Sequence, residues 1–225
     1  MALDLEREAL IASGVTGDRA IARCKDKIEV LIRSFPGKRP SSTDPQAAAG
    51  SLFDWLWKTK PRRYRRGGSS RLHEVIAAQL DERQTTVGNC LGLTVLFNCL
   101  LGRLGIRAGA VHLECAFDLA PHVLTTLDTA AGPIDIENIL PWGFDYRGHI
   151  DAPDRTVWGD SELVADIYLS RGNDSFERGD YEGALSDYDR TLAWNPGYEA
   201  ALLNRAMVLD VLEPIWKRKR QTTVP

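Results

Sequence analysis

Cys90 is the residue of this 225-residue chain whose surroundings most favour nucleophilic chemistry. The polar segment 81–86 precedes it, and an almost unbroken apolar run follows it as far as Leu104. A run of this length that is apolar on all sides predicts a buried helix, which Gly105 is suited to end. Cys90 would then lie at the N-terminus of this helix, where free backbone N–H groups and the helix dipole favour a thiolate. Such a nucleophile needs a base and an orienting acid from elsewhere in the chain.

A predicted β-hairpin downstream offers one histidine and two carboxylates. Residues 122–137 contain two segments of period-two alternation joined by a short Gly-containing turn, which is typical of a hairpin. If the turn comprises residues 128–131, His122 lies opposite Glu137, and Asp135 shares their face of the sheet. A slip of one residue would move these side chains to the other face. The hairpin therefore gives Cys90 a candidate base and two candidate acids.

Other interpretations of these residue types stay open. A free cysteine is often a small buried hydrophobic residue, and Cys90 can be one. His112 is a second candidate base, although it lies in the middle of a predicted strand between two apolar residues. Cys24, Cys99 and Cys115 are predicted to lie in the core. The four cysteines show no C-x-x-C spacing, so the sequence predicts no structural zinc site, and it implies no metal or cofactor.

Composition is that of an ordinary globular protein. The hydrophobic fraction is 44%, the charged fraction 26% and the net charge −3, a balance that favours neither nucleic acid nor a membrane as a partner. The charged N-terminus does not resemble a signal peptide, and no apolar stretch is long enough to span a bilayer. We therefore expect a cytoplasmic protein with reduced cysteines.

Helical periodicity predicts an N-terminal set of helices. They cover residues 2–12, residues 18–35, a segment capped by Thr43 or Asp44 with Pro45 in its first turn, and residues 72–80. The segment Lys58–Arg71 between the last two holds seven basic residues and no acidic one. We interpret it as a solvated loop, the alternative being a site for phosphate or for an acidic partner.

The apolar period changes from about 3.6 to 2 after the central helix, which indicates strands. Residues 106–115 form the first strand, before the hairpin. Residues 138–160 are rich in Gly, Pro, Asp and Trp and predict irregular structure, with Trp142 and Trp158 packing on the domain. His149 has no patterned partner and is left unassigned. The sequence as a whole predicts the α+β class.

The last third of the chain carries small and aromatic residues at characteristic positions. They are Tyr168, Gly172, Asn173, Gly179-Asp180-Tyr181, Ala184-Leu185, Tyr188 and Asn195-Pro196. The pattern resembles one tetratricopeptide repeat, a helix pair of about 34 residues. Ser175 and Thr191 stand where the repeat usually has an aromatic residue and an alanine. The resemblance implies two helices, near 162–176 and 181–194, and a protein-binding role. A third helix, 199–212, would cap them before Pro214 and the basic tail.

The order of the candidate site residues also matches a known superfamily. Gly88-x-Cys90 opens the apolar helix, His122 opens one strand, and Asp135 lies in the next. This set resembles the transglutaminase-like superfamily of papain-like cysteine enzymes over roughly residues 72–140. The resemblance implies a central nucleophile helix packed on an antiparallel sheet. One departure is that Val123-Leu124 replaces the aromatic residue usual after the histidine. Transglutaminase-like domains followed by tetratricopeptide repeats form a known bacterial arrangement.

The resemblance assigns roles to the candidate residues. His122 would take the proton of the Cys90 thiol and later donate one to the leaving amine. Asp135 would orient the imidazole, with Glu137 as the alternative. The backbone N–H of Cys90 and the side chain of Gln84 are the candidate oxyanion donors. The product of the first step is a thioester, which water hydrolyses and an amine converts to a new amide.

Two functions follow from these assignments. The first is a cysteine hydrolase or acyltransferase that acts on a peptide or isopeptide amide, with protein binding through the repeat. The second is a catalytically inactive adaptor of the same architecture, because fold does not certify activity. The expected domains are an N-terminal helical segment (1–43), a transglutaminase-like domain (44–160) and a repeat segment with a capping helix and basic tail (161–225).

Overall fold

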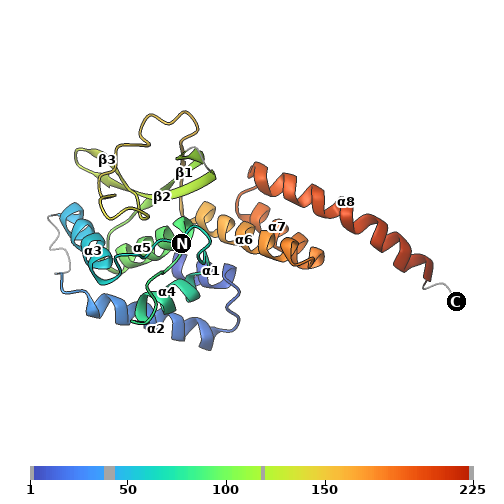
Figure 1. Ribbon diagram of the computed structural model, residues 1–225, viewed down its shortest axis with the longest axis horizontal. Coiled ribbons are helices and arrows are strands. Elements are labelled where there is room, and N and C mark those ends of the chain that lie inside the picture. Colours follow the sequence, from blue (N-terminus) through green and yellow to red (C-terminus); the bar gives the residue numbers. More distant parts are fainter. Residues whose placement is uncertain (1–2, 38–43, 118–119, 223–225) are drawn as a thin grey trace. The chain divides into compact units, whose positions relative to one another are not determined.

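A computed structural model describes residues 3–37, 44–117 and 120–222 of the chain (Figure 1). It combines helices with one antiparallel sheet, in agreement with the α+β class. The chain divides into two units, Met1–Leu163 and Val164–Pro225. This division falls three residues after the end of the predicted second domain, and the predicted segment 1–43 belongs to the first unit. No helix in the described ranges has the length and apolar character needed to cross a membrane.

The two units differ in composition. The first unit contains α1 (Leu5–Ala12), α2 (Asp18–Ser34), α3 (Pro45–Thr59), α4 (Leu72–Leu80), α5 (Cys90–Arg103), β1 (Gly109–Ala116), β2 (Ala120–Thr129), β3 (Gly132–Ile136), β4 (Thr156–Trp158) and the start of α6 (Asp160–Glu177). The second unit contains the rest of α6, α7 (Tyr181–Trp194) and α8 (Glu199–Thr222). Figure 1 shows α5 in the middle of the first unit, with the sheet on one side and α2 and α4 on the other.

The central helix α5 begins and ends as its sequence predicts. The Asn89 side chain accepts a hydrogen bond from the Gly92 N–H (2.9 Å) and so caps the N-terminus. All side chains from Leu91 to Leu101 are buried, as expected of a helix that is apolar on all sides. Gly105 adopts a φ of +78° just beyond the end of the helix, a conformation that glycine adopts without strain. The helix therefore forms the centre of the core.

The sheet has the order β3-β2-β1-β4, with antiparallel pairing of β2 with β1 and with β3. The β2–β3 turn is shorter than predicted, because Thr129 already pairs with Gly132. The predicted register is therefore wrong by two residues: Asp135 pairs with Thr126, and Glu137 lies just beyond β3. A shift of two residues keeps every side chain on its predicted face. His122, Asp135 and Glu137 consequently still share one face.

The segment 138–160 differs from the irregular structure expected of it. Residues 156–158 form β4, in which Trp158 pairs with Ala110 of β1. Trp158 is buried, as expected, and stacks on His112 with ring centroids 4.1 Å apart. Trp142 is 72% exposed, so the prediction that it packs on the domain is wrong. Most of this segment covers the face of the sheet that carries the candidate acids, as the contacts of Asp135 and Glu137 show.

The basic segment Lys58–Arg71 is only in part the solvated loop that its composition predicts, because two of its basic residues are buried. Lys60 is buried and donates to the backbone carbonyls of Asp81 and Gln84, both at 2.6 Å. Arg63 is only 1% exposed and lies over the Trp57 ring, 5.8 Å from its centroid. Burial lowers the pKa of Arg63 to about 9. The segment is therefore anchored on the domain through Lys60 and Arg63, while its basic residues Lys58, Arg62, Arg65 and Arg66 remain exposed.

The second unit is a helical assembly held by small residues and polar contacts. A Cβ added at Gly172 of α6 would lie 2.6 Å from the Tyr188 ring of α7, so only glycine allows this approach. The Tyr188 hydroxyl donates to Asn173 (2.9 Å), and Arg171 pairs with Asp187. The α8 helix runs through Pro214 to Thr222, so the prediction that it ends near residue 212 is wrong.

Candidate functional site

Cys90 is the first residue of α5 and is half-buried. A neighbouring loop fixes its position, because the Asn89 N–H donates to the Ser69 carbonyl at 3.1 Å. A Cβ added at Gly92 would lie 2.4 Å from the same carbonyl. The first turn of α5 and residue 69 are therefore packed too closely to admit any other residue at position 92. The backbone N–H groups of such a first turn have no acceptor within the helix.

Cys90, His122 and Glu137 lie together at the start of α5. His122 Nε2 lies 2.8 Å from Glu137 Oε2, and the neighbouring Cys90 side chain raises the pKa of His122. His122 and Glu137 are both buried, and Glu137 is fully so. The Ile139 N–H donates to the other oxygen of Glu137 at 3.3 Å, which fixes the plane of the carboxylate. The structure therefore brings together a thiol, an imidazole and a carboxylate in the order needed for nucleophilic catalysis.

Asp135, the first candidate for the orienting acid, has a different partner. Arg155 donates to both of its carboxylate oxygens, at 2.6 and 2.8 Å. Such a two-point pair holds both groups in a fixed geometry. Asp135 is buried, and the charge of Arg155 compensates its own. The acid that contacts His122 is thus Glu137, the alternative candidate. Asp135 instead anchors the segment 138–160, called the covering segment below, to β3.

The charges of the site are mutually stabilising. Burial opposes protonation of His122, but its hydrogen bonds to Cys90 and Glu137 outweigh burial and raise its pKa to about 10. Burial likewise opposes ionisation of Glu137, but hydrogen bonding from His122 and the nearby His149 imidazole lowers its pKa. At neutral pH these directions favour an imidazolium beside a carboxylate. A positive charge next to Cys90 is what activates a cysteine nucleophile.

A buried polar network joins α5, β2 and the residues just beyond β3, which carry Cys90, His122 and Glu137 respectively. Asn138, the neighbour of Glu137, donates to the Thr125 hydroxyl at 2.9 Å. Thr125 of β2 donates in turn to Asn98 Oδ1 of α5 at 2.8 Å. Thr94 of α5 donates to the Val123 carbonyl, next to His122, at 3.2 Å. Satisfied buried networks of this kind fix a unique arrangement, and this one sets the distance between α5 and β2.

Two residues near the site were not found by sequence reasoning. Burial raises the pKa of Tyr64, the charges of Cys90 and Glu137 raise it further, and that of Arg66 opposes them. The backbone of Tyr64 pairs with Gly88, two residues before Cys90. The single aromatic residue within a basic run was the only signal for it.

His149 is the second of these residues. Its Nε2 lies 3.5 Å from Glu137 Oε2, and its ring packs edge-on against Phe117 and Tyr146, with centroids 4.8 and 5.0 Å away. His149 lies in the covering segment without any periodic pattern around it, so only the fold brings it to Glu137. One donor atom each from His122, Glu137 and His149 lie within 4.8 Å of one another, a set that suits a metal ion.

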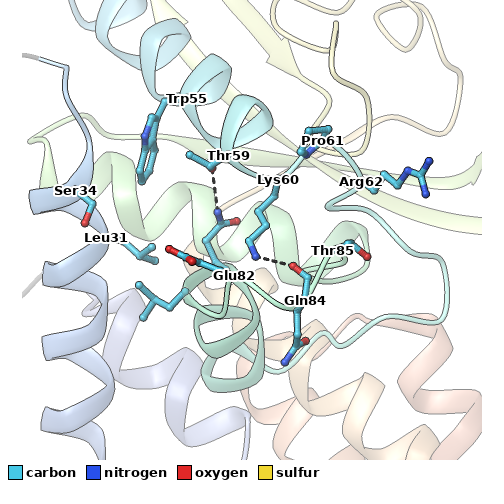
Figure 2. A pocket seen from close by; sticks show the side chains of 12 residues that line it. Leu31, Ser34, Trp55, Thr59, Lys60, Pro61, Arg62, Glu82, Gln84 and Thr85 are labelled. Atoms are coloured by element: carbon cyan, nitrogen blue, oxygen red, sulfur yellow. Dashed lines mark hydrogen bonds between the residues drawn. The ribbon is translucent and has the colours of Figure 1, made fainter.

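Gln84, the candidate oxyanion donor, is engaged away from this group. Its carbonyl accepts from Lys60 Nζ, and its backbone N–H donates to the Asp81 carbonyl at 3.0 Å. Gln84 lines a pocket of about 660 Å³ together with Trp55 and Thr59 (Figure 2). Neither Cys90 nor its two partners line this pocket. The backbone N–H of Cys90 is thus the remaining oxyanion donor of those proposed from the sequence.

The other candidates have structural positions. His112 pairs with Val123, the neighbour of His122, so that strand alternation directs the two histidines to opposite faces. Burial lowers the pKa of His112 to about 4, and its ring stacks on Trp158. Cys99 is buried, as expected, and Cys24 is half-buried. Cys115 is exposed, so the prediction that it lies in the core is wrong.

Comparison of the chain with models of protein families, with curated proteins and with solved structures found no match. The chemistry of the site therefore has to be argued from its own geometry.

Proposed function

We propose that the protein is a cysteine hydrolase or acyltransferase of the transglutaminase-like type that acts on a peptide or isopeptide amide. The observation that carries this proposal is the buried pair of His122 and Glu137, 2.8 Å apart, beside Cys90 at the N-terminus of α5. Cys90 is half-buried rather than enclosed, so that an extended substrate can approach its sulfur. A buried structural cysteine would need neither an imidazole partner nor a buried carboxylate behind it.

The reaction follows from the roles that this geometry supports. The Cys90 sulfur attacks the amide carbonyl, and the oxyanion lies near the free N–H groups at the start of α5. The His122 imidazolium donates its proton to the leaving amine as the C–N bond breaks, which leaves a thioester. Water, or a second amine, loses its proton to the neutral imidazole and attacks the thioester. The Cys90 thiolate departs, and Glu137 keeps the imidazole oriented throughout.

Alkylation by iodoacetamide tests the proposal within a single chain. Cys90 and the exposed Cys115 are compared by mass spectrometry of their peptides over a range of pH. Cys90 should react faster than Cys115 at about pH 6, where an ordinary thiol is almost wholly protonated. In the variant His122→Gln this advantage should disappear. Equal rates at Cys90 and Cys115 in the wild-type protein, or a rate that is insensitive to His122, would contradict the proposal.

A second candidate function is that of a protein-binding adaptor, which rests on the second unit. The contact of Gly172 with Tyr188 supports one tetratricopeptide repeat formed by α6 and α7, with α8 as its cap. Leu203 and Met207 of α8 are 66% and 52% exposed. A helix that only caps the repeat is expected to expose polar side chains instead. The adaptor function alone predicts no preferential alkylation of Cys90, so the same experiment separates the two functions.

A further inference from the structure

His149 presents a buried ring nitrogen that no group in the described ranges satisfies. The residue is 6% exposed, and its Nε2 has no hydrogen-bond partner. The nearest acidic oxygen is Glu137 Oε2, 3.5 Å away. Leaving such a nitrogen unpaired costs about 1–3 kcal/mol. In the proposed acyl transfer His149 touches no reacting atom and acts only through its effect on the pKa of Glu137.

His149 belongs to a group of three side chains that can each supply one metal ligand. His122 of β2, Glu137 just beyond β3 and His149 of the segment 138–160 each offer one ligand atom, and these atoms lie within 4.8 Å of one another. A tetrahedral zinc ion with bonds of about 2.0–2.1 Å holds its ligand atoms roughly 3.3 Å apart. The separation of 3.5 Å between His149 and Glu137 is already close to that value. The 2.8 Å contact of His122 with Glu137 has to lengthen by about 0.5 Å, and the separation of the two histidine ligand atoms, at most 4.8 Å, has to shorten by at most about 1.5 Å.

We propose that His122, Glu137 and His149 bind a Zn²⁺ ion, and that the bound ion switches off the chemistry of Cys90. Two imidazoles and one carboxylate are a ligand set that zinc prefers, whereas Mg²⁺ and Ca²⁺ prefer oxygen alone. The carboxylate is already held in place by the Ile139 N–H, which donates to Oε1 and leaves Oε2 for the metal. Such outer hydrogen bonds orient metal ligands.

The loss of Cys90 reactivity on zinc binding follows from the two ring nitrogens of His122. This part of the inference rests on the proposed function. Glu137 engages His122 at Nε2, which leaves Nδ1 as the nitrogen that serves Cys90. A metal on Nε2 takes its lone pair, so that Nδ1 carries the only ring proton. The ring then accepts no proton from a thiol, and Glu137 no longer orients it. Zinc should therefore reduce both the reactivity of Cys90 and any acyl transfer.

Zinc binding is measured directly on the metal-free full chain by isothermal titration calorimetry. The exposed Cys115 is replaced by serine in every protein, so that this thiol does not add a site. The parent should bind one Zn²⁺ ion. The variant His149→Gln should bind it at least about 100-fold more weakly, since loss of an outer-shell partner alone costs 10–100-fold. The matched control is His73→Gln, which changes a half-exposed histidine of α4. It should bind zinc like the parent, and equal affinity in the parent and His149→Gln would overturn the site.

Cobalt provides a second measurement that needs no change to the proposed ligands. Co²⁺ in the parent protein should give the intense visible bands of a tetrahedral ion. It should not give the near-ultraviolet charge-transfer band of a thiolate ligand, because the proposed set contains no sulfur. A strong thiolate band would place the metal on a cysteine and would overturn the proposed ligand set.

Alkylation of Cys90 with and without Zn²⁺ separates this inference from the proposed function. Zinc should slow alkylation in the parent and leave the rate of His149→Gln unchanged by the metal. His149-dependent zinc binding to a protein whose metal-free Cys90 is unreactive would refute the proposed function and support the metal site. A reactive Cys90 without His149-dependent binding would do the reverse. Binding that does not alter the alkylation rate would overturn the switch.

Discussion

His122 Nε2 lies 2.8 Å from Glu137 Oε2, and both groups are buried. This contact makes Glu137, rather than Asp135, the group that stabilises a positive imidazole beside Cys90.

The first prediction compares the two carboxylates. Glu137→Gln removes the charge that stabilises the His122 imidazolium, so Cys90 alkylation at about pH 6 should slow. A loss of about 1.4 kcal/mol in this stabilisation corresponds to a tenfold lower rate. Asp135→Asn, which changes an acid bound to Arg155, should slow alkylation of the folded protein far less. Equal rates for wild type and Glu137→Gln would contradict the assignment.

A second prediction concerns the ion pair that anchors the covering segment. Arg155→Met leaves the buried Asp135 charge without its partner, and the free energy of unfolding in urea should fall by about 3 kcal/mol. The control is Arg147→Met, which breaks an exposed pair with Asp145 and should change stability by less than about 1 kcal/mol. Similar losses in both variants would show that Arg155 does not hold the segment.

The sequence was sufficient for the elements and for the face of the hairpin that carries the chemistry. The period of two in β2 and β3 places His122 and Glu137 on one face whether the turn has two residues or four. The apolar run after Cys90 predicts a buried helix with the thiol at its start, which the structure confirms. These features are local and follow from periodicity and capping alone.

The choice between the two acids was not local. Asp135 and Glu137 are equivalent in pattern, and they are distinguished by Arg155, which lies 20 residues away in a segment without periodicity. His149 reaches Glu137 from the same segment. The basic run was misinterpreted for a related reason, because the composition of a segment does not reveal that Arg63 stacks on Trp57 inside the core.

The third prediction tests the close contact at the start of α5. Gly92→Ala puts a Cβ 2.4 Å from the Ser69 carbonyl, and relief of this clash should cost about 1–3 kcal/mol of unfolding free energy. Gly102→Ala is the matched control in the same helix, since no neighbour lies within 4 Å of its Cβ. It should raise stability by about 0.5–1 kcal/mol, because alanine favours the helix. Urea denaturation should therefore show a lower free energy of unfolding for Gly92→Ala and a higher one for Gly102→Ala. A loss at both positions would point to helix flexibility, rather than the contact with Ser69, as the cause.

The fourth prediction concerns the polar network between α5 and β2. Asn138→Ala leaves the Thr125 hydroxyl without its donor, and it should cost about 1–3 kcal/mol of stability. Thr125→Val alone should cost a similar amount, while the double variant should cost less than the sum of the two. Strict additivity in this double-mutant cycle would show that the two side chains do not act together.

The last prediction is the pH dependence of stability. The pKa of His122 is raised from 6.5 to about 10, so the folded protein binds this proton more tightly than the unfolded chain does. Its contribution to the free energy of unfolding is therefore fully present below pH 6.5 and is lost as the pH rises to about 10. Over this window the slope is at most about −1.4 kcal/mol per pH unit. Urea denaturation of wild type and His122→Gln at several pH values isolates the contribution of His122 to the free energy of unfolding, because the other titrating groups are common to both proteins. The stability difference between the two should shrink toward high pH, and a difference that grows would show that His122 is neutral in the folded protein.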